Sequence, residues 1–213
     1  MFGSGSASGT APSGTAGDRL ARIIDAAYRC FTRHGVRRTT MDDIAEAAGM
    51  SRPAVYQYVR NKDEAFRRLA AHIFEQTLAR ARSAAAGGGT LAQRLDRILA
   101  TKLSLTQRLW HETPHAAELL GENTRISGDL EASFMADLAQ LLTETITDAA
   151  VQAELALRDT DAREIAELAL ALTRGLEADL SNPDRTRDRL RNGIALLVAG
   201  LAATAPSTVE EPT

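Results

Sequence analysis

The residues whose types and spacing could carry out chemistry stand together just past the middle of the chain. The segment His111-Glu112-Thr113-Pro114-His115 satisfies the pattern H-E-x-x-H. On a helix this pattern sets two imidazoles on one face for zinc, with the glutamate as general base. Pro114 would interrupt that helix, and no third ligand follows nearby. The motif therefore favours a hinge with polar groups near a ligand, or plain surface histidines, over a zinc hydrolase, and no metal or cofactor is expected.

Cys30 is the only cysteine, so the chain cannot form an internal disulfide. It lies among Ile24, Ala27 and Phe31, where a buried small side chain is expected rather than a reactive thiol. The longest apolar run, 194–205, is shorter than the roughly 20 residues that cross a bilayer. The first residues do not resemble a secretory signal. We expect a cytoplasmic protein that does not contact a membrane.

Charge is divided unevenly along the 213 residues. The formal net charge is −3, but residues 18–68 carry eleven Arg or Lys against seven Asp or Glu. That segment is at +4, which leaves the remainder at −7. The asymmetry indicates that only the N-terminal part meets phosphate groups. A composition rich in Ala, Leu, Arg and Glu, with only nine aromatic residues, favours an all-α fold.

Apolar spacing and capping residues predict four helices in and just after the basic segment. Their expected ranges are 18–34, 40–48, 52–59 and 61–86. Gly35 and Gly49 end the first two helices, and Thr40 with Asp43 forms a capping box for the second. Ser51 caps the third. Two short helices across a tight turn make a helix-turn-helix.

The third predicted helix is suited to contact DNA from its outer face. Its spacing turns Ala54 and Val55 toward a small core. The opposite face carries side chains that donate hydrogen bonds or offer flat surfaces, namely Arg52, Tyr56, Gln57 and Tyr58. Spacing alone also suits a helical hairpin with a solvated basic face, so that alternative stays open at this point.

Beyond the glycines at 87–89, the pattern predicts five more helices. Their ranges are about 91–110, 114–121, 129–157, 161–180 and 183–203. Thr113-Pro114 and Asn182-Pro183 each place a cap residue before a proline at the first helical position. The expected divisions are a tail at 1–17, a helix-turn-helix DNA-binding domain at 18–65, a helical ligand-binding and dimerisation domain at 66–205 and a tail at 206–213.

Residues 22–66 resemble the DNA-binding segment of the TetR/AcrR family of bacterial regulators. The family's Gly-hydrophobic, Thr-Thr, Asp-Ile-Ala, Ala-Gly, Ser, Tyr and Asn-Lys features occur in order in RIIDAAYRCFTRHGVRRTTMDDIAEAAGMSRPAVYQYVRNKDEAF. The resemblance covers about a fifth of the chain, and the rest agrees in length and helical character. It implies a homodimer that binds a palindromic double-stranded DNA operator, most often as a repressor that a small molecule releases.

The resemblance also implies which side chains meet DNA. Base edges would face Arg52, Pro53 and Gln57, and phosphates would be held by Thr40, Tyr56, Tyr58 and Lys62, with Ser51 and Ala54 in the same set. Arginine can address guanine at two points, and proline and alanine can pack on a thymine methyl. Lys62 adds its charge at a helix start that already favours an anion. Many relatives carry Gly where Pro53 stands, which affects base preference.

In that family, the last two helices pair with those of a second subunit. Apolar stripes on 161–180 and 183–203 suit this role, and small Ala199 and Gly200 permit close helix approach. The residues expected at the dimer interface are Leu168, Leu172, Leu176, Ile194, Leu197 and Leu201. The stripes alone would equally suit burial within one subunit.

The middle helices of such proteins enclose an effector pocket. Its expected lining comprises Phe74, Leu78, Leu103, Trp110, His111, His115, Phe134 and Leu138, and it suggests a mostly apolar compound. The aromatic members would equally suit a core. A ligand near Trp110 would tilt the fourth helix and change the separation of the recognition helices.

Three alternatives to a repressor remain from the sequence. The first is a transcriptional activator of the same fold. The second is a zinc enzyme built on His111, Glu112 and His115, which bound zinc and loss of activity on chelation would reveal. The third is a protein that compacts DNA, which would bind every sequence alike.

Overall fold

The computed structural model describes residues 15–152, 157, 160–178 and 180–203, and within these ranges it contains eight helices and no strand. The expected all-α fold is confirmed. The helices are α1 (Ala16–His34), α2 (Met41–Ala48), α3 (Arg52–Tyr56), α4 (Lys62–Ala86), α5 (Leu91–Glu112), α6 (Ala116–Val151), α7 (Ala162–Leu176) and α8 (Pro183–Ala203).

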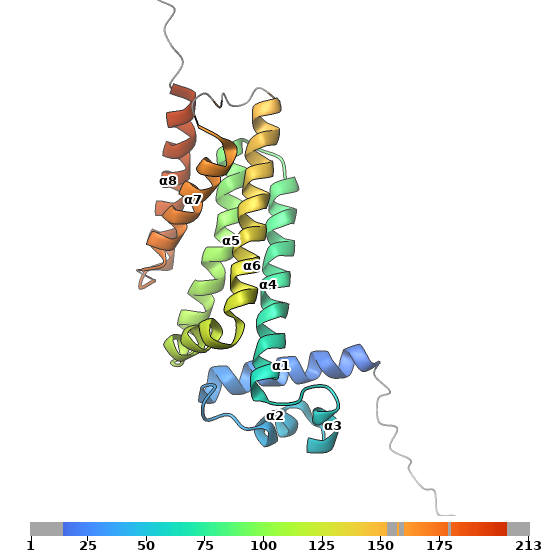
Figure 1. Cartoon of the computed structure of the whole chain (residues 1–213). Helices are drawn as coiled ribbons and strands as arrows, with labels where there is room; N and C mark the ends of the chain where they lie inside the picture. The colour runs from blue at the N-terminus through green and yellow to red at the C-terminus, as the bar shows by residue number, and fades with distance from the viewer. Residues whose placement is uncertain (1–14, 153–156, 158–159, 179, 204–213) are drawn as a thin grey trace, which may run out of the picture.

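The helices form two parts (Figure 1). Helices α1, α2 and α3 gather at one end, and α4, α5 and α6 run side by side away from them, with α7 and α8 along one side. Helix α4 belongs to both parts, because it packs on α1 and also on α5 and α6. Near its start, Phe66 meets Phe31 of α1 with ring centroids 5.5 Å apart. In the described part of the chain, no helix combines the length and the apolar character needed to cross a membrane.

The N-terminal cluster is the hydrophobic core of α1, α2 and α3, and it extends to the first turns of α4 and to Leu119 of α6. Cys30 lies in it, buried as expected, and burial raises the pKa of its thiol. Phe66 and Leu69 of α4 also belong to this cluster. The predicted boundary between residues 65 and 66 therefore cuts through a packed core.

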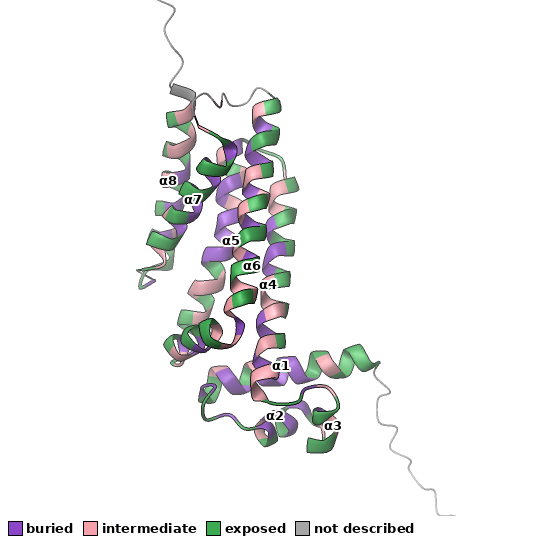
Figure 2. Cartoon of the chain, in the orientation of Figure 1, coloured by how far each residue is buried: buried purple, intermediate pink, exposed green. Residues whose placement is uncertain are grey.

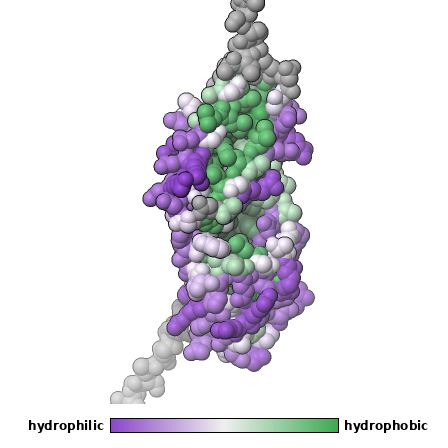
Figure 3. Space-filling model, turned by 90° about the vertical axis from the view of Figure 1, so that its left-hand side faces the viewer, coloured by the Kyte–Doolittle hydropathy of each residue, from purple (hydrophilic) through white to green (hydrophobic). Residues whose placement is uncertain are grey.

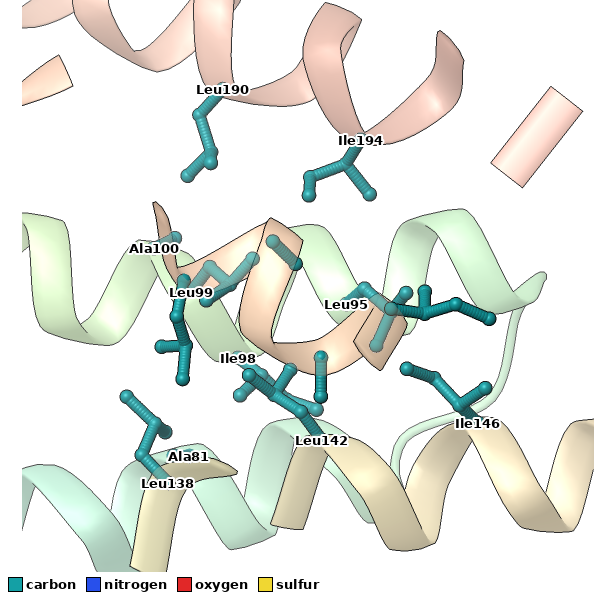
Figure 4. Packing of buried hydrophobic residues seen from close by; sticks show 14 of the residues in the cluster. Ala81, Leu95, Ile98, Leu99, Ala100, Leu138, Leu142, Ile146, Leu190 and Ile194 are labelled. Atoms are coloured by element: carbon teal, nitrogen blue, oxygen red, sulfur yellow. The ribbon is translucent and has the colours of Figure 1, made fainter. Parts of the chain in front are cut away.

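The body cluster is the second core, and it takes side chains from each of α4 to α8. Buried faces of these helices turn toward one another (Figure 2). Figure 4 shows Leu95, Ile98 and Leu99 of α5 packed among side chains of the neighbouring helices. Burying one Leu or Ile side chain fully contributes about 1.5 to 3 kcal/mol. The body is therefore held mainly by apolar burial.

The predicted helices at 114–121 and 129–157 correspond to two helical segments of α6, 116–126 and 128–151, that meet at a kink, so only the loop expected between them is wrong. Helix α6 is one 36-residue element with a single non-helical residue, Ser127, at φ −133° and ψ 18°. The expected cap at Thr113-Pro114 is also wrong, because Thr113 ends α5 and α6 begins only after His115. The Thr113 hydroxyl donates to the Thr32 carbonyl of α1 and accepts from the His115 N–H at 2.9 Å. The hydrogen bond to α1 therefore keeps the turn between α5 and α6 in a non-helical conformation.

Other predicted boundaries lie close to the observed ones. Asn182-Pro183 begins α8 as expected, with the Arg185 N–H donating to Asn182 Oδ1 at 3.0 Å. Helix α3 ends at Tyr56 rather than at about 59, and α7 ends at Leu176 rather than at about 180. Thr15 caps α1, so the helix begins inside the predicted tail at 1–17. Residues 1–14 of that tail and all of the tail at 206–213 lie outside the described residues.

Candidate nucleic-acid interface

Short-range capping bonds build the helix-turn-helix. The Asp43 N–H donates to Thr40 Oγ1 at 3.2 Å, and the Thr40 N–H donates to Asp43 Oδ2 at 2.7 Å, which completes the predicted capping box of α2. Gly49 adopts φ 63° and ψ 37°, the left-handed conformation that ends a helix. The Met50 N–H then donates to the Ala45 carbonyl at 3.0 Å. These bonds turn the chain sharply into α3.

Helix α3 presents a mixed polar and flat face to the outside. Val55 is fully buried in the N-terminal cluster, as its spacing predicts, whereas Ala54 is only half-buried. The exposed residues are Ser51, Arg52, Pro53, Tyr56 and Gln57, and Tyr58 is half-buried against the N-terminal cluster. The structure therefore brings the residues predicted to contact DNA onto one end of the molecule, and their roles stay predictions.

Two neighbouring side chains hold Arg52 in place. Its Nη1 donates to Asp42 Oδ2 at 2.9 Å, and its Cζ lies 5.5 Å from the centroid of the Tyr56 ring. The hydrogen bond to Tyr56, followed by the charge of Asp42, raises the pKa of the Arg52 guanidinium. Arg52 therefore stays charged, with its guanidinium held between Asp42 and Tyr56.

Two predicted phosphate contacts also have internal partners. Lys62 Nζ donates to the Arg37 carbonyl at 3.1 Å, and the Thr40 hydroxyl donates to Asp43 Oδ2 at 2.8 Å. Close by, a small hollow of about 220 Å³ is lined by Arg33, His34, Arg38, Asp43 and His115. This hollow brings basic side chains from the end of α1 and the turn that follows it beside Asp43 of α2 and His115.

The structure does not assemble the H-E-x-x-H residues into a metal site. His111 Nε2 lies 3.1 Å from the Leu180 carbonyl oxygen, and His115 Nδ1 lies 3.8 Å from Glu118 Oε2. Glu112 Oε2 accepts a 2.5 Å hydrogen bond from the Tyr28 hydroxyl, and burial followed by this bond raises the pKa of Tyr28 to about 12. Among the described residues, no three His, Cys, Asp or Glu side chains cluster as a metal site would require.

The predicted effector lining falls into two groups. Phe74 and Phe134 stack with centroids 5.0 Å apart, and Leu78, Leu103 and Leu138 are buried in the same body cluster. The other members, Trp110, His111 and His115, stand at the end of α5 and the start of α6, where Trp110 is 47% exposed. In this conformation the first group is packed core, and its role in binding a ligand stays a prediction.

The residues predicted at a dimer interface follow one apolar face, with one correction. Leu168 is 52% exposed, and the half-buried members are Leu172, Leu176, Leu197 and Leu201. Ile194 is fully buried in its own subunit, so it does not belong to this face (Figure 4). Leu196, two residues further along α8, is 74% exposed. Figure 3 shows hydrophobic side chains gathered over the upper part of the side that carries α7 and α8.

Sequence reasoning missed the charged residues that join the two parts. Arg67 of α4 contacts Asp129 of α6, and Arg37 contacts Glu122 of α6. The partners stand 62 and 85 residues apart in the chain. Only a folded structure can reveal such pairs, because no local spacing connects them.

Comparison with known proteins places the N-terminal segment. Residues 23–69 match the family described as bacterial regulatory proteins, tetR family. The HTH-type transcriptional regulator TtgR of Pseudomonas putida is 47% identical over 55 residues, which cover 26% of this chain and 26% of TtgR. The chain thus matches about a quarter of the length of such curated relatives.

Solved structures share the fold over most of the chain. The fatty acid degradation regulator FadR from Bacillus halodurans has a TM-score of 0.66 at 18% identity, covering 88% of this chain and 98% of FadR. SmeT, the repressor of the Stenotrophomonas maltophilia multidrug efflux pump SmeDEF, has a TM-score of 0.64 at 19% identity, covering 94% and 98%. A SmeT-triclosan complex has a TM-score of 0.60 at 22% identity, covering 92% and 99%.

Proposed function

We propose that this chain, whose residues 23–69 match the tetR family of bacterial regulatory proteins, is a dimeric transcriptional repressor that a small molecule releases from DNA. The observation that carries this proposal is the exposed face of α3, which presents Arg52, Tyr56 and Gln57 to solvent. These residues lie within segment 18–68, whose net charge is +4. The proposed compartment is the cytoplasm, where a bacterial operator lies.

Arg52 is the proposed base-reading residue. Asp42 and the Tyr56 ring already hold its guanidinium in place at the start of α3. A guanine offers two acceptors in the major groove, which match the two-point geometry of arginine. Breaking the Arg52–Asp42 ion pair to make this contact loses little binding free energy, because an exposed ion pair contributes about 0 to 1 kcal/mol.

Tyr56 and Lys62 are the proposed phosphate contacts beside it. Tyr56 is 40% exposed and presents its hydroxyl near the Arg52 guanidinium, with 3.5 Å between Arg52 Nη2 and the oxygen. Lys62 is the first residue of α4, where unpaired backbone N–H groups already favour an anion. Phosphate contacts fix orientation without carrying sequence information.

The apolar face of α7 and α8 supports assembly as a homodimer. Leu168 and Leu196 project from it, and Ala199 and Gly200 are exposed on α8, where they allow another helix to approach closely. Side chains of this size are rarely left in one exposed patch on a monomer. A two-fold dimer places two α3 helices on one side of the DNA and calls for a palindromic operator, with half-sites about 34 to 36 Å apart.

The body is the proposed effector site. SmeT, which shares this fold, has been solved with triclosan. In this chain, an apolar compound entering between α4, α5 and α6 would have to separate Phe74 from Phe134, whose rings now stack. Such a compound releases DNA only if it binds the non-fitting state more tightly, and typical coupling changes operator affinity about 5- to 150-fold.

Selection of bound DNA from a random pool tests the proposal and yields the operator. The wild type should enrich a palindrome. Arg52→Ala should relax preference at one position of each half-site, at a cost of about 1 to 3 kcal/mol, whereas Tyr56→Phe and Lys62→Ala should weaken binding similarly across sequences. Unchanged base preference in Arg52→Ala would remove Arg52 from the reading role. Equal binding to every sequence would contradict an operator-specific repressor.

A further inference from the structure

Helix α6 contains a bend that no proline explains. Ser127 leaves the helical conformation at φ −133° and ψ 18°, and it is completely buried. Within the described residues, its hydroxyl finds no hydrogen-bond partner. The bend divides α6 into a first segment, 116–126, and a second segment, 128–151. Sharp helix bends have specific causes, and insertion of a side chain into the backbone ladder is one of them.

The first segment packs with the DNA-binding part, which comprises α1, α2, α3 and the start of α4. Leu119 is buried in the N-terminal cluster. Glu118 Oε1 accepts a hydrogen bond from the Arg37 N–H at 2.8 Å, and Glu122 Oε1 accepts one from Arg37 Nε at 3.3 Å. Gly35 lies so close that an added Cβ would stand 2.5 Å from Glu118 Oε2. The first segment therefore grips the turn between α1 and α2.

The second segment belongs to the body. Phe134, Leu138, Leu142 and Ile146 all lie in the body cluster. The two segments of α6 thus pack in different cores, and Ser127 lies where one core gives way to the other. A boundary between two packed units inside one helix is a natural hinge position.

Arg67 of α4 spans this boundary. Its Nη1 donates to the Ile126 carbonyl at 3.2 Å and to Asp129 Oδ1 at 2.6 Å, and its Nη2 donates to Asp129 Oδ2. Arg67 therefore binds a backbone carbonyl just before the bend and a carboxylate just after it. We call this arrangement the Arg67 clasp.

The surroundings leave the bend room to change. An open hollow of about 710 Å³ borders it, lined by Arg125, Ile126 and Leu130 of α6 and by residues at and just before the start of α4, namely Arg60, Asn61, Asp63, Glu64, Arg67, Arg68 and Ala71. The contacts across this hollow are charged side chains rather than packed apolar ones, such as Arg125 Nη2 donating to Asp63 Oδ2 at 3.2 Å. Exposed ion pairs exchange partners more readily than a dry core repacks.

We propose that Ser127 is a hinge between the DNA-binding part and the body, and that Arg67 is the positioning residue that holds its angle. A body that closes on a ligand moves the second segment of α6 against α4. The clasp passes that movement to the first segment, which holds the turn at Gly35 to Arg37. This route adds to the tilt of α4 itself. Its DNA-binding consequence rests on the proposed function.

Hydrogen exchange of the full chain without DNA tests the hinge. The variants are Arg67→Ala, Asp129→Asn and Arg67→Lys, which keeps a charge but not the two-point geometry. The matched control is Arg68→Ala, because Arg68 is adjacent on α4 but pairs with Glu64 of its own helix. Amides at 118–130 should exchange about tenfold or more faster in Arg67→Ala and Asp129→Asn, less so in Arg67→Lys, and as in the wild type in Arg68→Ala. Amides at 134–149 should be unchanged.

Unchanged exchange at 118–130 in Arg67→Ala would overturn the hinge. Equal acceleration along 134–149 would also overturn it, because it would show that Arg67 merely stabilises the body. Circular dichroism and thermal unfolding establish whether each variant is folded. If Arg67→Ala does not fold, Arg67→Lys and Asp129→Asn decide the question by the same comparison.

Operator DNA obtained by selection tests the coupling. In the wild type, operator binding should slow exchange on both sides of Ser127, whereas in Arg67→Ala the effect should stop at residue 126. The operator affinity of Arg67→Ala should also shift by about 5- to 150-fold, the usual range for coupled sites. An unshifted affinity together with faster exchange at 118–130 would overturn the coupling. If the wild type binds no DNA, the proposed function fails, while the exchange without DNA still decides the hinge.

Discussion

The DNA-binding part and the body are built by different rules. In the first, capping boxes at Thr15 and Thr40 and turn glycines at Gly35 and Gly49 fix both ends of α1 and α2 within the chain's own neighbourhood. In the body, long helices rich in Ala and Leu find their places through the apolar contacts of the body cluster. The family match likewise falls in the first part, at residues 23–69. A helix that contacts base edges needs an exact backbone path, whereas many sequences can fill a core.

Charge separates the two regions as well. The DNA-binding part leaves basic side chains on its surface, and ion pairs of Arg37 and Arg67 join it to the body beside the buried Leu119. The body has a largely apolar interior with a nearly buried ion pair, in which Lys102 Nζ lies 2.6 Å from both carboxylate oxygens of Glu177. Thr106 donates to the same carboxylate at 2.8 Å. This pair ties the end of α7 to α5, and so steadies the face proposed for dimerisation.

The largest expected effect lies in the body. Leu196→Glu places a charge on the exposed apolar face, where the wild-type side chain is 74% exposed in the single chain, so the fold should survive. The dimer should dissociate, because a carboxylate cannot be buried at an apolar interface without a partner. Loss of the second half-site contact should then weaken operator binding by about 10²- to 10⁴-fold. Analytical ultracentrifugation and operator titration measure the two effects.

The matched control is Val151→Glu, a change of the same kind at the end of α6, where Val151 is 82% exposed. It should remain dimeric and bind operator as the wild type does. If Leu196→Glu still sediments as a dimer, the interface lies elsewhere. The apolar face of the body would then not be the feature that makes the chain a dimer.

Two turn glycines test whether glycine is needed only for the local backbone conformation or also for the contact between the DNA-binding part and α6. Gly35 has φ 79° and ψ 159°, a conformation nearly confined to glycine, and its environment also includes Glu118. Gly49 is left-handed at φ 63°, and an added Cβ there meets nothing within 4 Å. Gly35→Ala should lower the free energy of unfolding by about 1 to 3 kcal/mol and Gly49→Ala by about 1 kcal/mol. Urea denaturation of both variants measures the difference.

Gly35→Ala should also speed hydrogen exchange at 116–126, because the new methyl displaces the Glu118 carboxylate that accepts from the Arg37 N–H. Gly49→Ala should leave that segment unchanged. Equal stability losses, with no change of exchange in either variant, would show that the joint adds nothing to the local demand for glycine.

The smallest expected effect is a dependence on acid at the joint. The hydrogen bonds from Arg67 lower the pKa of Asp129 from 3.8 to about 2, and Arg125 lowers the pKa of Glu122 below its usual 4.5. Since both folded pKa values lie below the unfolded ones, the stabilisation is present at neutral pH. It is lost as the pH falls from about 4.5 toward 2. The Asp129 side chain is exposed, so its share of the loss is modest.

Urea unfolding at pH 7, 4 and 3 measures this dependence. The free energy of unfolding should fall less steeply with acid in Asp129→Asn than in the wild type, because the variant has no proton to take up there. Parallel pH profiles for the two proteins would show that the clasp does not add to the stability of the joint.

The sequence by itself determined the helix-turn-helix. Thr40, Gly49 and Ser51 act on the backbone within three or four residues, so their effect is legible without the fold. The spacing of Val55 likewise placed it in the core. The same reasoning located the exposed face of α3, because a short helix with one buried side must expose the other.

Tertiary structure decided the rest, because its partners stand far apart in the chain. A hydrogen bond from Thr113 to the Thr32 carbonyl set the conformation of the turn after α5, and the two helices predicted next meet at the Ser127 kink of α6. Packing also placed Ile194 inside the subunit and left Leu196 exposed. An apolar stripe does not specify which neighbour covers it, and a lone arginine does not specify its carboxylate. The Arg67 clasp, whose two residues are 62 positions apart, exists only once α4 and α6 have packed together.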